Sequence, residues 1–439
     1  MDVYTKEEVL DKAREYNVKF IRLQFTDIFG LLKNIAVTVE ELERALDGRV
    51  MFDSSAIEGF VGSRERDICL RPDPVTFKVF PWRPRDGAVA RLICDVCLPD
   101  GEPFGGCSRS VLQRVTGEAE KMDLNLRVGA QIEFFLFLLD EQGKPTMLTH
   151  DQAGYCDVTP VDLGENARRD MVLTLEEMGF QISSSHHEVA PGQHEIFIKD
   201  DDALAMADKI VTFKFVVRTI AQRHGLHASF MPRPFAGFNG SSMCLHLGLW
   251  RGERNVFDGC GDEPGLSGVA RCYIGGLIRH ARSLTAIANP LVNSYKRLLP
   301  DEHSPVLVAW SSHNRNTMIK IPSPGDGESR IILRSPDAAC NPYLMLAAAL
   351  KAGLHGIAGD MAAPPEEGMD CVDLKELVRQ KGLPRSLREA LDALESDEVV
   401  KEALGGHIVE RFVKVKNEEW ECFQTEIHPW ELKRYLANY

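Results

Sequence analysis

Two extended runs of residues flank the dipeptide Pro191-Gly192, and this pattern restricts the fold more than any other stretch of the chain. The stretch 182–199 reads ISSSHHEVAPGQHEIFIK, and Pro-Gly is a turn signal. Tight pairing across the turn would place Glu188 opposite Glu195, with both side chains on one face of the pair. Neighbouring carboxylates repel each other unless something neutralises them, and a hard divalent cation prefers oxygen ligands.

Two observations keep a second interpretation of this hairpin open. Exposed hairpins are common, so both glutamates could instead be solvated surface residues. Pro-Gly also suits a type II turn better than the primed turns of tight hairpins, so the sequence does not fix the register of the two strands.

A second strand-like run, residues 128–139, contains one carboxylate in an apolar setting. It reads VGAQIEFFLFLL, and alternation places Gln131 and Glu133 on the same face. A buried carboxylate needs a partner or a metal, although an edge strand could instead turn Glu133 to solvent. Taken together, Glu133, Glu188 and Glu195 predict a cation site made of three carboxylates.

The composition excludes several classes of protein. The formal net charge is −14, so the chain lacks the basic surface that nucleic acids and anionic membranes attract. The apolar run 343–350 is too short to span a bilayer, and the charged N-terminus reads as a helix rather than a signal peptide. Eleven scattered cysteines form no disulfide pattern, and we expect free thiols in a cytoplasmic protein without nucleic-acid or membrane partners.

The order of predicted elements indicates an α+β protein of two parts. Residues 5–16 read as a helix with a Thr5–Glu8 capping box, and a strand over 18–25 follows. Gly, Pro and Ser are dense over 99–110, where we place a boundary between domains 1–103 and 104–439. In the second part strands alternate with helices, among them predicted helices over 201–225 and 267–288.

Several motifs together resemble type I glutamine synthetases. They are EFFLF, HHEVAPGQHEI, MFDSSAIEGF, NGSSMCLHL, NSYKRLLP, RIILRSPDAACNPYL and HPWELKRYL, and they run through most of the chain. The resemblance implies a small N-terminal β-grasp-like domain and a large catalytic domain with a curved antiparallel sheet and surrounding helices. It also implies a homo-oligomer, a dodecamer of two hexameric rings, with active sites between neighbouring subunits.

The resemblance implies that the ligands of one family cation site are present in this chain and that those of a second site are not. Glu133, Glu188 and Glu195 match the three ligands of the first Mg²⁺ or Mn²⁺. The family binds a second cation, nearest the transferred phosphate, with two glutamates and a histidine, and those positions here are Gln131, Cys244 and Ile332. Isoleucine cannot bind a metal, amide oxygen is a weak ligand and thiolate a soft one, so we expect a cation at one site only.

The remaining family positions suggest roles for ten further residues. For glutamate or a γ-glutamyl analogue the resemblance implies Asn239, Gly240, Arg297 and Arg334, because arginine binds carboxylates through two donors. For the nucleotide it implies His246, Arg330 and Lys320, where lysine replaces the family's arginine and keeps its charge without the bidentate fork. For catalysis it implies Asp53 from a neighbouring subunit, the phosphate-stabilising Arg315, and His303 in place of the flap glutamate.

These assignments favour a ligase that joins the γ-carboxylate of glutamate to ammonia or, in preference, to another amine with ATP. Replacement of the flap glutamate by His303 removes an anionic contact to ammonium, which is consistent with a different nucleophile. The alternative is an inactive homologue that senses a glutamate-type ligand, acts as a scaffold or joins a hetero-oligomer. A one-metal enzyme that does not use ATP is a further alternative, although no new nucleophile–base pair stands out.

Overall fold

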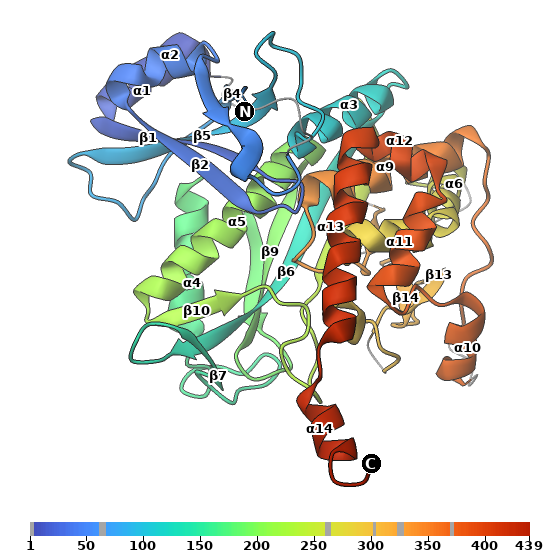
Figure 1. Ribbon diagram of the computed structural model, residues 1–439. Coiled ribbons are helices and arrows are strands. Elements are labelled where there is room, and N and C mark those ends of the chain that lie inside the picture. Colours follow the sequence, from blue (N-terminus) through green and yellow to red (C-terminus); the bar gives the residue numbers. More distant parts are fainter. Residues whose placement is uncertain (1–3, 61–66, 260–264, 302–303, 323–328, 369–372) are drawn as a thin grey trace.

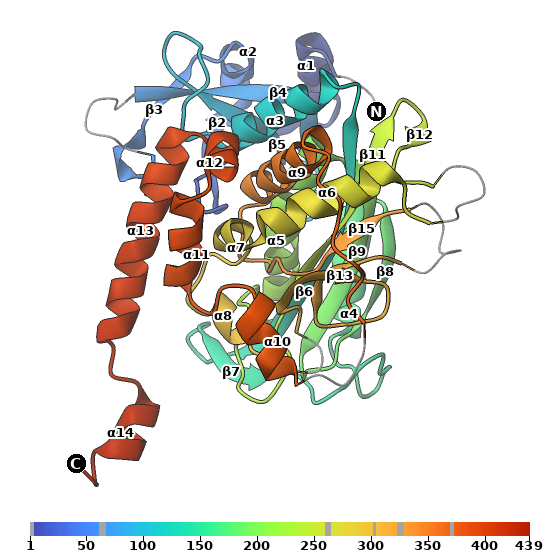
Figure 2. The same ribbon diagram turned by 90° about the vertical axis from the view of Figure 1, so that its right-hand side faces the viewer.

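The computed structural model describes residues 4–60, 67–259, 265–301, 304–322, 329–368 and 373–439. The first strands form a separate five-stranded sheet in the order β2-β1-β5-β4-β3, in which β1 and β5 run parallel and the other pairs antiparallel. Figures 1 and 2 show this sheet as a layer at one end of the molecule. Its elements are α1 (Lys6–Glu15), β1 (Val18–Thr26), β2 (Leu32–Thr38), η1 (Val39–Glu41), α2 (Leu42–Leu46), β3 (Val50–Asp53), η2 (Ser54–Ala56), β4 (Asp67–Val79) and β5 (Ala88–Cys97).

A ten-stranded sheet organises the rest of the chain. Seven strands follow the order β13-β14-β15-β11-β6-β9-β8, while β7 and β10 pair with β6 and β12 pairs with β11. The strands are β6 (Asn125–Leu139), β7 (Pro145–Thr149), β8 (Ile182–His187), β9 (Gln193–Asp202), β10 (Leu226–Ser229), β11 (Met243–Arg251), β12 (Arg254–Asn255), β13 (Leu307–Ser311), β14 (Thr317–Lys320) and β15 (Ile331–Leu333).

Helices surround this sheet, and α14 extends away from the body at the C-terminus (Figure 1). They are α3 (Ser108–Glu120), α4 (Glu165–Glu177), α5 (Ala203–Arg223), α6 (Gly268–Arg279), α7 (Ala281–Ala288), α8 (Ser294–Arg297), α9 (Pro342–Ala358), α10 (Leu374–Lys381), α11 (Leu387–Glu395), α12 (Glu398–Leu404), α13 (Gly406–Thr425) and α14 (Pro429–Tyr435). The predicted α+β architecture, with a small N-terminal domain and a large domain built on a curved sheet, is therefore confirmed.

Local sequence signals account for most of the helix boundaries. The Thr5–Glu8 capping box is present at the start of α1, and Asn341 caps α9 with Pro342 as its first residue. The single helix predicted over 267–288 is wrong, because it is divided at His280 into α6 and α7. The His280 ring is held between Asp397 and His355, and this tertiary contact stabilises the break.

The register across the Pro191-Gly192 turn differs from the tight pairing predicted. β8 pairs with β9 so that His186, not Glu188, opposes Glu195. Gly192 has φ +66° and the Gln193 amide donates to the Ala190 carbonyl at 3.0 Å, as in a type II turn. Residues that tight pairing would place in β8 belong to the wider turn instead. Glu188 therefore follows His187, the last residue of β8.

A buried ion network joins the N-terminal sheet to helices α3 and α5 through one arginine. Arg109 of α3 donates to Asp73 of β4 at 2.7 Å, to Asp95 of β5 at 2.8 Å and to Asp208 of α5 at 3.0 Å. Tyr343 of α9 donates to the same Asp208 at 2.6 Å. The N-terminal sheet is thus attached to the helices behind the large sheet by groups that are costly to leave unpaired.

Candidate active site

The strand pairing places the candidate residues on one face of the large sheet. Glu133 of β6 directly opposes Glu195 of β9, and Gln131 of β6 directly opposes Cys244 of β11. Directly opposite residues share a face, as do alternate residues within one strand. By the same argument that face also carries His246, Ile332 and Lys320.

The two hairpin glutamates converge with a histidine that the sequence analysis missed. His186, Glu188 and Glu195 each offer a ligand atom, and these three atoms lie within 4.8 Å of one another. The His186 Nε2 atom lies 3.0 Å from the Glu188 carboxylate. The signal for His186 was its place two residues before Glu188, but its position opposite Glu195 depends on the register that only the fold reveals.

The carboxylate of Glu133 is held firmly in its place. It accepts hydrogen bonds from the Ser242 amide at 2.8 Å, the Ser242 hydroxyl at 2.6 Å and the Gln193 amide nitrogen at 3.1 Å. Burial and the nearby charge of Glu188 nevertheless raise the pKa of Glu133. These fixed bonds fit a carboxylate that is oriented for a ligand and does not face bulk solvent.

Crowding of like charges is strongest at Glu195. Burial, followed by the charges of Glu133 and Glu188, raises the pKa of Glu195 to about 8. Three carboxylates in one buried place are unfavourable without a positive charge, and their oxygens are the ligands that Mg²⁺ and Mn²⁺ prefer. The residues present therefore fit a hard divalent cation.

We expect the stabilisation of this protein by Mg²⁺ to increase with pH. Without a cation the folded protein keeps the Glu195 proton up to about pH 8, whereas the unfolded chain loses it near the ordinary pKa of 4.5. The free energy of unfolding of the metal-free protein should therefore fall between those two pH values, and the cation should restore it by displacing the proton. The rise in melting temperature on adding Mg²⁺ should be larger at about pH 8.5 than at about pH 6. An equal rise at both pH values would contradict this expectation.

A neutral hydrogen-bond chain occupies the positions that match the family's second cation. The His246 Nε2 atom lies 2.8 Å from the Gln131 carbonyl oxygen, and the Gln131 amide donates to Glu195 at 3.3 Å. Burial and the charges of Arg330 and Lys320 lower the pKa of His246 to about 3, so the imidazole is neutral and Nε2 donates. Cys244 is also protonated at neutral pH, because burial raises its pKa to about 11. The third position, Ile332, is buried and offers no ligand.

Part of the predicted glutamate pocket lies beside the carboxylates. Gly240 accepts a hydrogen bond from Gln193 at 3.2 Å, and Gln193 also donates to Glu133. A Cβ atom at Gly240 would lie 2.8 Å from the side chain of Arg297, so these two residues are in contact. The Arg297 guanidinium donates to the Ser335 carbonyl, while its Nε atom is buried without a hydrogen bond. Asn239 is adjacent to Gly240 and half-buried.

The other predicted residues either border this core or belong to another part of the fold. Arg334 donates to the backbone of Arg315, whose own side chain is exposed, and Lys320 is exposed at the end of β14. Asp53 belongs to the N-terminal sheet, where it accepts from the Ser55 amide at 2.8 Å. His303 lies outside the described residues.

The turn that carries the two hairpin glutamates depends on a glycine. A Cβ atom on Gly192 would lie 2.9 Å from the Leu136 carbonyl oxygen and 2.9 Å from Thr149, in addition to the positive φ. Gly192→Ala should lower the free energy of unfolding by about 2–4 kcal/mol. Gly143→Ala is the matched control, because Gly143 also has a positive φ but open space around it, and it should cost only about 1–2 kcal/mol. Equal losses in urea denaturation would show that the close contact is unimportant.

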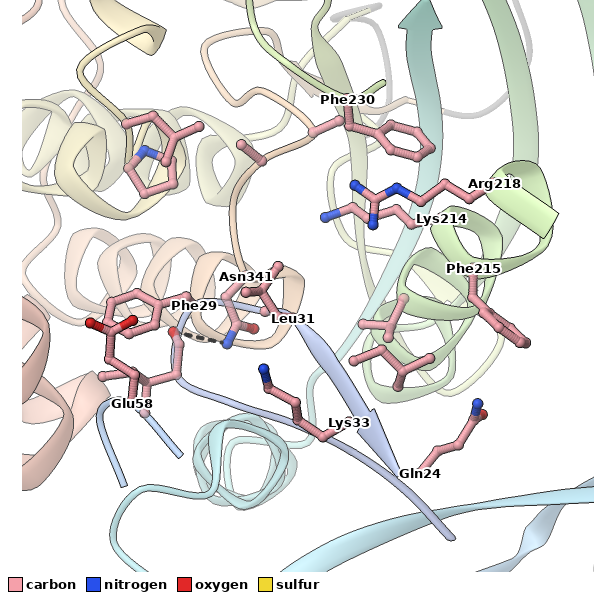
Figure 3. A pocket seen from close by; sticks show the side chains of 18 of the residues that line it. Gln24, Phe29, Leu31, Lys33, Glu58, Lys214, Phe215, Arg218, Phe230 and Asn341 are labelled. Atoms are coloured by element: carbon pink, nitrogen blue, oxygen red, sulfur yellow. Dashed lines mark hydrogen bonds between the residues drawn. The ribbon is translucent and has the colours of Figure 1, made fainter. Parts of the chain in front are cut away.

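A separate cavity of about 1150 Å³ lies between the N-terminal strands, α5 and α13. Figure 3 shows Lys214, Arg218 and Phe230 on one side of this cavity and Gln24 and Lys33 on the opposite side. None of the candidate residues that the structure describes lines this cavity, so it is distinct from the carboxylate site. No helix in the described part of the chain has the length and apolar character needed to cross a bilayer.

Two family models match consecutive parts of the chain. The glutamine synthetase β-grasp domain matches residues 17–99, and the glutamine synthetase catalytic domain matches residues 105–435. Among solved structures, a GmaS/ADP complex superposes with a TM-score of 0.88 at 33% identity, over 98% of this chain and 99% of that one. A Plasmodium falciparum glutamine synthetase shares the fold with a TM-score of 0.87 at 22% identity, over 99% of both chains.

Sequence relatives match over the whole length. The glutamine synthetase of Clostridium saccharobutylicum is 50% identical over 100% of both chains. That of Thermus thermophilus is 49% identical over 99% of this chain and 100% of its own. With both domains matched in order and identity near one half throughout, this chain belongs to the glutamine synthetase family.

Proposed function

We propose that this protein is an ATP-dependent ligase that joins the γ-carboxylate of glutamate to an amine larger than ammonia. The observation that carries the ligase is the group of three carboxylates suited to a cation, in which Glu133 and Glu195 oppose each other on one sheet face and Glu188 follows β8. The larger amine is proposed from His303, which stands where the family has the flap glutamate. This replacement removes an anionic contact to ammonium.

One resident cation, Mg²⁺ or Mn²⁺, is part of the proposal. Glu133, Glu188 and Glu195 would hold it, and when bound it would neutralise phosphate oxygens during transfer from ATP to the substrate carboxylate. The second family site does not fit a cation, because Gln131 is engaged by His246 and Glu195 and the other two positions offer no hard ligand. The cationic side chains of Lys320, Arg330 and Arg315 would supply positive charge on the phosphate side.

The glutamate contacts are proposed from one buried donor of Arg297. Its Nε atom lacks a hydrogen bond, and a substrate carboxylate would provide one. Gly240 leaves the Arg297 side chain room to approach, and Asn239 lies next to it. Arg334 would bind the second carboxylate end of the substrate.

Family relationship supports an enzyme over the inactive homologue. Relatives that are 48–50% identical over nearly the whole chain carry the name glutamine synthetase, and the GmaS structure contains ADP. Cys244 and Ile332 then mean that the phosphate side lacks a second cation, and not that activity is absent. His303 is proposed to line the amine side of the site.

Completion of the site by a neighbouring subunit is a further part of the proposal. Asp53 lies on β3, the edge strand of the N-terminal sheet, in a different sheet from the carboxylates. It would therefore serve the site of an adjacent copy in a ring, for which a dodecamer of two hexamers is the proposed assembly. The domain division at 103 and 104 is consistent with β5 ending at Cys97 and α3 beginning at Ser108.

The decisive experiment measures ADP release from ATP, Mg²⁺ and glutamate with ammonium, methylamine, ethylamine and propylamine in turn. We expect a higher kcat/KM for at least one alkylamine than for ammonium, with the γ-glutamyl amide identified by mass spectrometry. A preference for ammonium over every alkylamine would overturn the proposed amine. Absence of ADP release with all of them, in protein that does not bind ATP and Mg²⁺ by calorimetry, would overturn the ligase.

A further inference from the structure

A second cluster of ligand atoms is buried behind the hairpin turn. It combines two residues after β7, one residue before α4 and one residue of β9, and its four ligand atoms lie within 4.8 Å of one another. Nothing in the proposed reaction uses these residues, and their side chains are 5% exposed or less. They are His150, Asp151, Asp162 and His194.

The atoms that face the centre of this cluster have no hydrogen bonds. They are His150 Nε2, Asp151 Oδ2, Asp162 Oδ2 and His194 Nε2. The opposite oxygen of each carboxylate is engaged, since Asp151 accepts from the Gly192 amide at 2.9 Å and Asp162 accepts from the Gly164 amide at 2.9 Å. Three of these atoms still have a charged or polar neighbour, since His150 Nε2 lies 2.9 Å from Asp151 Oδ2 and Asp162 Oδ2 lies 2.7 Å from Arg168. Buried polar atoms are normally hydrogen-bonded, so their convergence on one place leaves room for a further partner.

The hydrogen bonding of His150 defines what this partner must be. Its Nδ1 atom lies 3.3 Å from the Leu136 carbonyl oxygen, to which it can only donate. The Nε2 atom lies 2.9 Å from the Asp151 carboxylate, so either a proton or a metal ion stands between the two. An imidazole that donates from its other nitrogen to a backbone carbonyl is the usual arrangement of a metal ligand.

A glycine leaves room for the two rings to converge. A Cβ atom on Gly164 would lie 2.5 Å from His150 Nε2 and 2.6 Å from His194 Nε2. Any other residue at this position would push the rings apart. The absence of a side chain at Gly164, before α4, therefore allows both ring nitrogens to approach one point.

Arg168 sets the order in which the four ligands become available. Its guanidinium lies 2.7 Å from Asp162 Oδ2 and 2.8 Å from His194 Nδ1, which it uses as an acceptor. His194 then carries its hydrogen on Nε2. It can bind a metal through Nε2 only after that hydrogen moves to Nδ1, and Arg168 must then give up its contact with Nδ1 and keep only its contact with Asp162. His150 and Asp151 offer their atoms without any such change, whereas Asp162 Oδ2 lies 2.7 Å from Arg168, which offsets only one of the two carboxylate charges.

We propose that this cluster binds a divalent cation of the zinc class through His150, Asp151 and Asp162, with His194 as the fourth ligand. Two imidazoles and two carboxylates are a common donor set for such an ion in tetrahedral geometry. The ion would tie the loop after β7 and the loop before α4 to β9. Asp151 also contacts His187 at 3.2 Å and the Gly192 amide, so the ion would stiffen the turn that presents Glu188 and Glu195.

The test is a titration of the metal-free full-length protein with Co²⁺ while excess Mg²⁺ occupies the carboxylate site. Tetrahedral Co²⁺ with nitrogen ligands absorbs visible light far more strongly than octahedral Co²⁺ with oxygen ligands. We expect one equivalent of strongly absorbing Co²⁺ that Zn²⁺ displaces. Absence of the band in the unaltered protein would overturn the proposal, and a buried water or a protonated His150 would then satisfy the cluster.

Variants assign the band to its residues. His150→Gln should weaken Co²⁺ binding at least ~10-fold, whereas Glu133→Gln, at the carboxylate site, should leave the band unchanged. The reverse pattern would place the ion at the carboxylate site and overturn the proposal. The titration of the unaltered protein already shows whether Co²⁺ binds with a strong absorption band. The proposal therefore stays testable even if a variant fails to fold.

Discussion

Replacing Glu195 with glutamine is expected to lower kcat/KM for γ-glutamyl amide formation by at least ~1000-fold, which corresponds to about 4 kcal/mol of transition-state stabilisation. Glu195 directly opposes Glu133, and both flank the position where the cation is proposed. The amide keeps the size of the side chain but removes one of three anionic ligands, so bound Mg²⁺ or Mn²⁺ should weaken as well. Steady-state kinetics and Mn²⁺ titration measure the two effects separately.

The matched control is Glu177→Gln, an exposed position at the end of α4. It should leave kcat/KM and Mn²⁺ affinity unchanged, because it removes the same charge from the surface. Glu195→Gln should also remove the rise of cation stabilisation with pH, since the carboxyl responsible for it is gone. If Glu195→Gln retained full activity, the assignment of the cation to these three carboxylates would be wrong.

Replacing Arg109 with methionine should lower the free energy of unfolding by about 3–5 kcal/mol. The Arg109 side chain is only 4% exposed and bridges Asp73, Asp95 and Asp208. Methionine fills similar volume but leaves these carboxylates buried without a counter-charge, so the N-terminal sheet should also separate more readily from α5. Urea denaturation followed by circular dichroism measures the loss.

Arg169→Met serves as the control for this substitution. Arg169 contacts Asp170 at 3.3 Å, with both side chains largely exposed, and exposed ion pairs contribute ~1 kcal/mol or less. A loss at Arg109 that is no greater than the loss at Arg169 would show that the buried network does not stabilise the junction of the N-terminal sheet with α3 and α5.

Short-range patterns predicted the types of element well. The capping box at Thr5 and the Asn341-Pro342 start of α9 depend on neighbouring residues alone, and both are present. The break at His280 was missed because it depends on Asp397, more than a hundred residues away in the sequence. No local periodicity can report such a contact.

For the site, the sequence determined which residue types were available and which side of each strand they occupy. Alternation placed Gln131 with Glu133, and the family motifs identified the glutamates of the hairpin. The tertiary structure alone decided which residues oppose each other across the strands. Glu195 opposes Glu133 of β6 on one side and His186 of β8 on the other. The pairing with His186 arises because the turn at Pro191-Gly192 is wider than a tight hairpin. The tertiary structure alone also brought His150, Asp151, Asp162 and His194 together. The physical reason is that side-chain period fixes a face within one strand, whereas register and loop closure are set by contacts between segments distant in the chain.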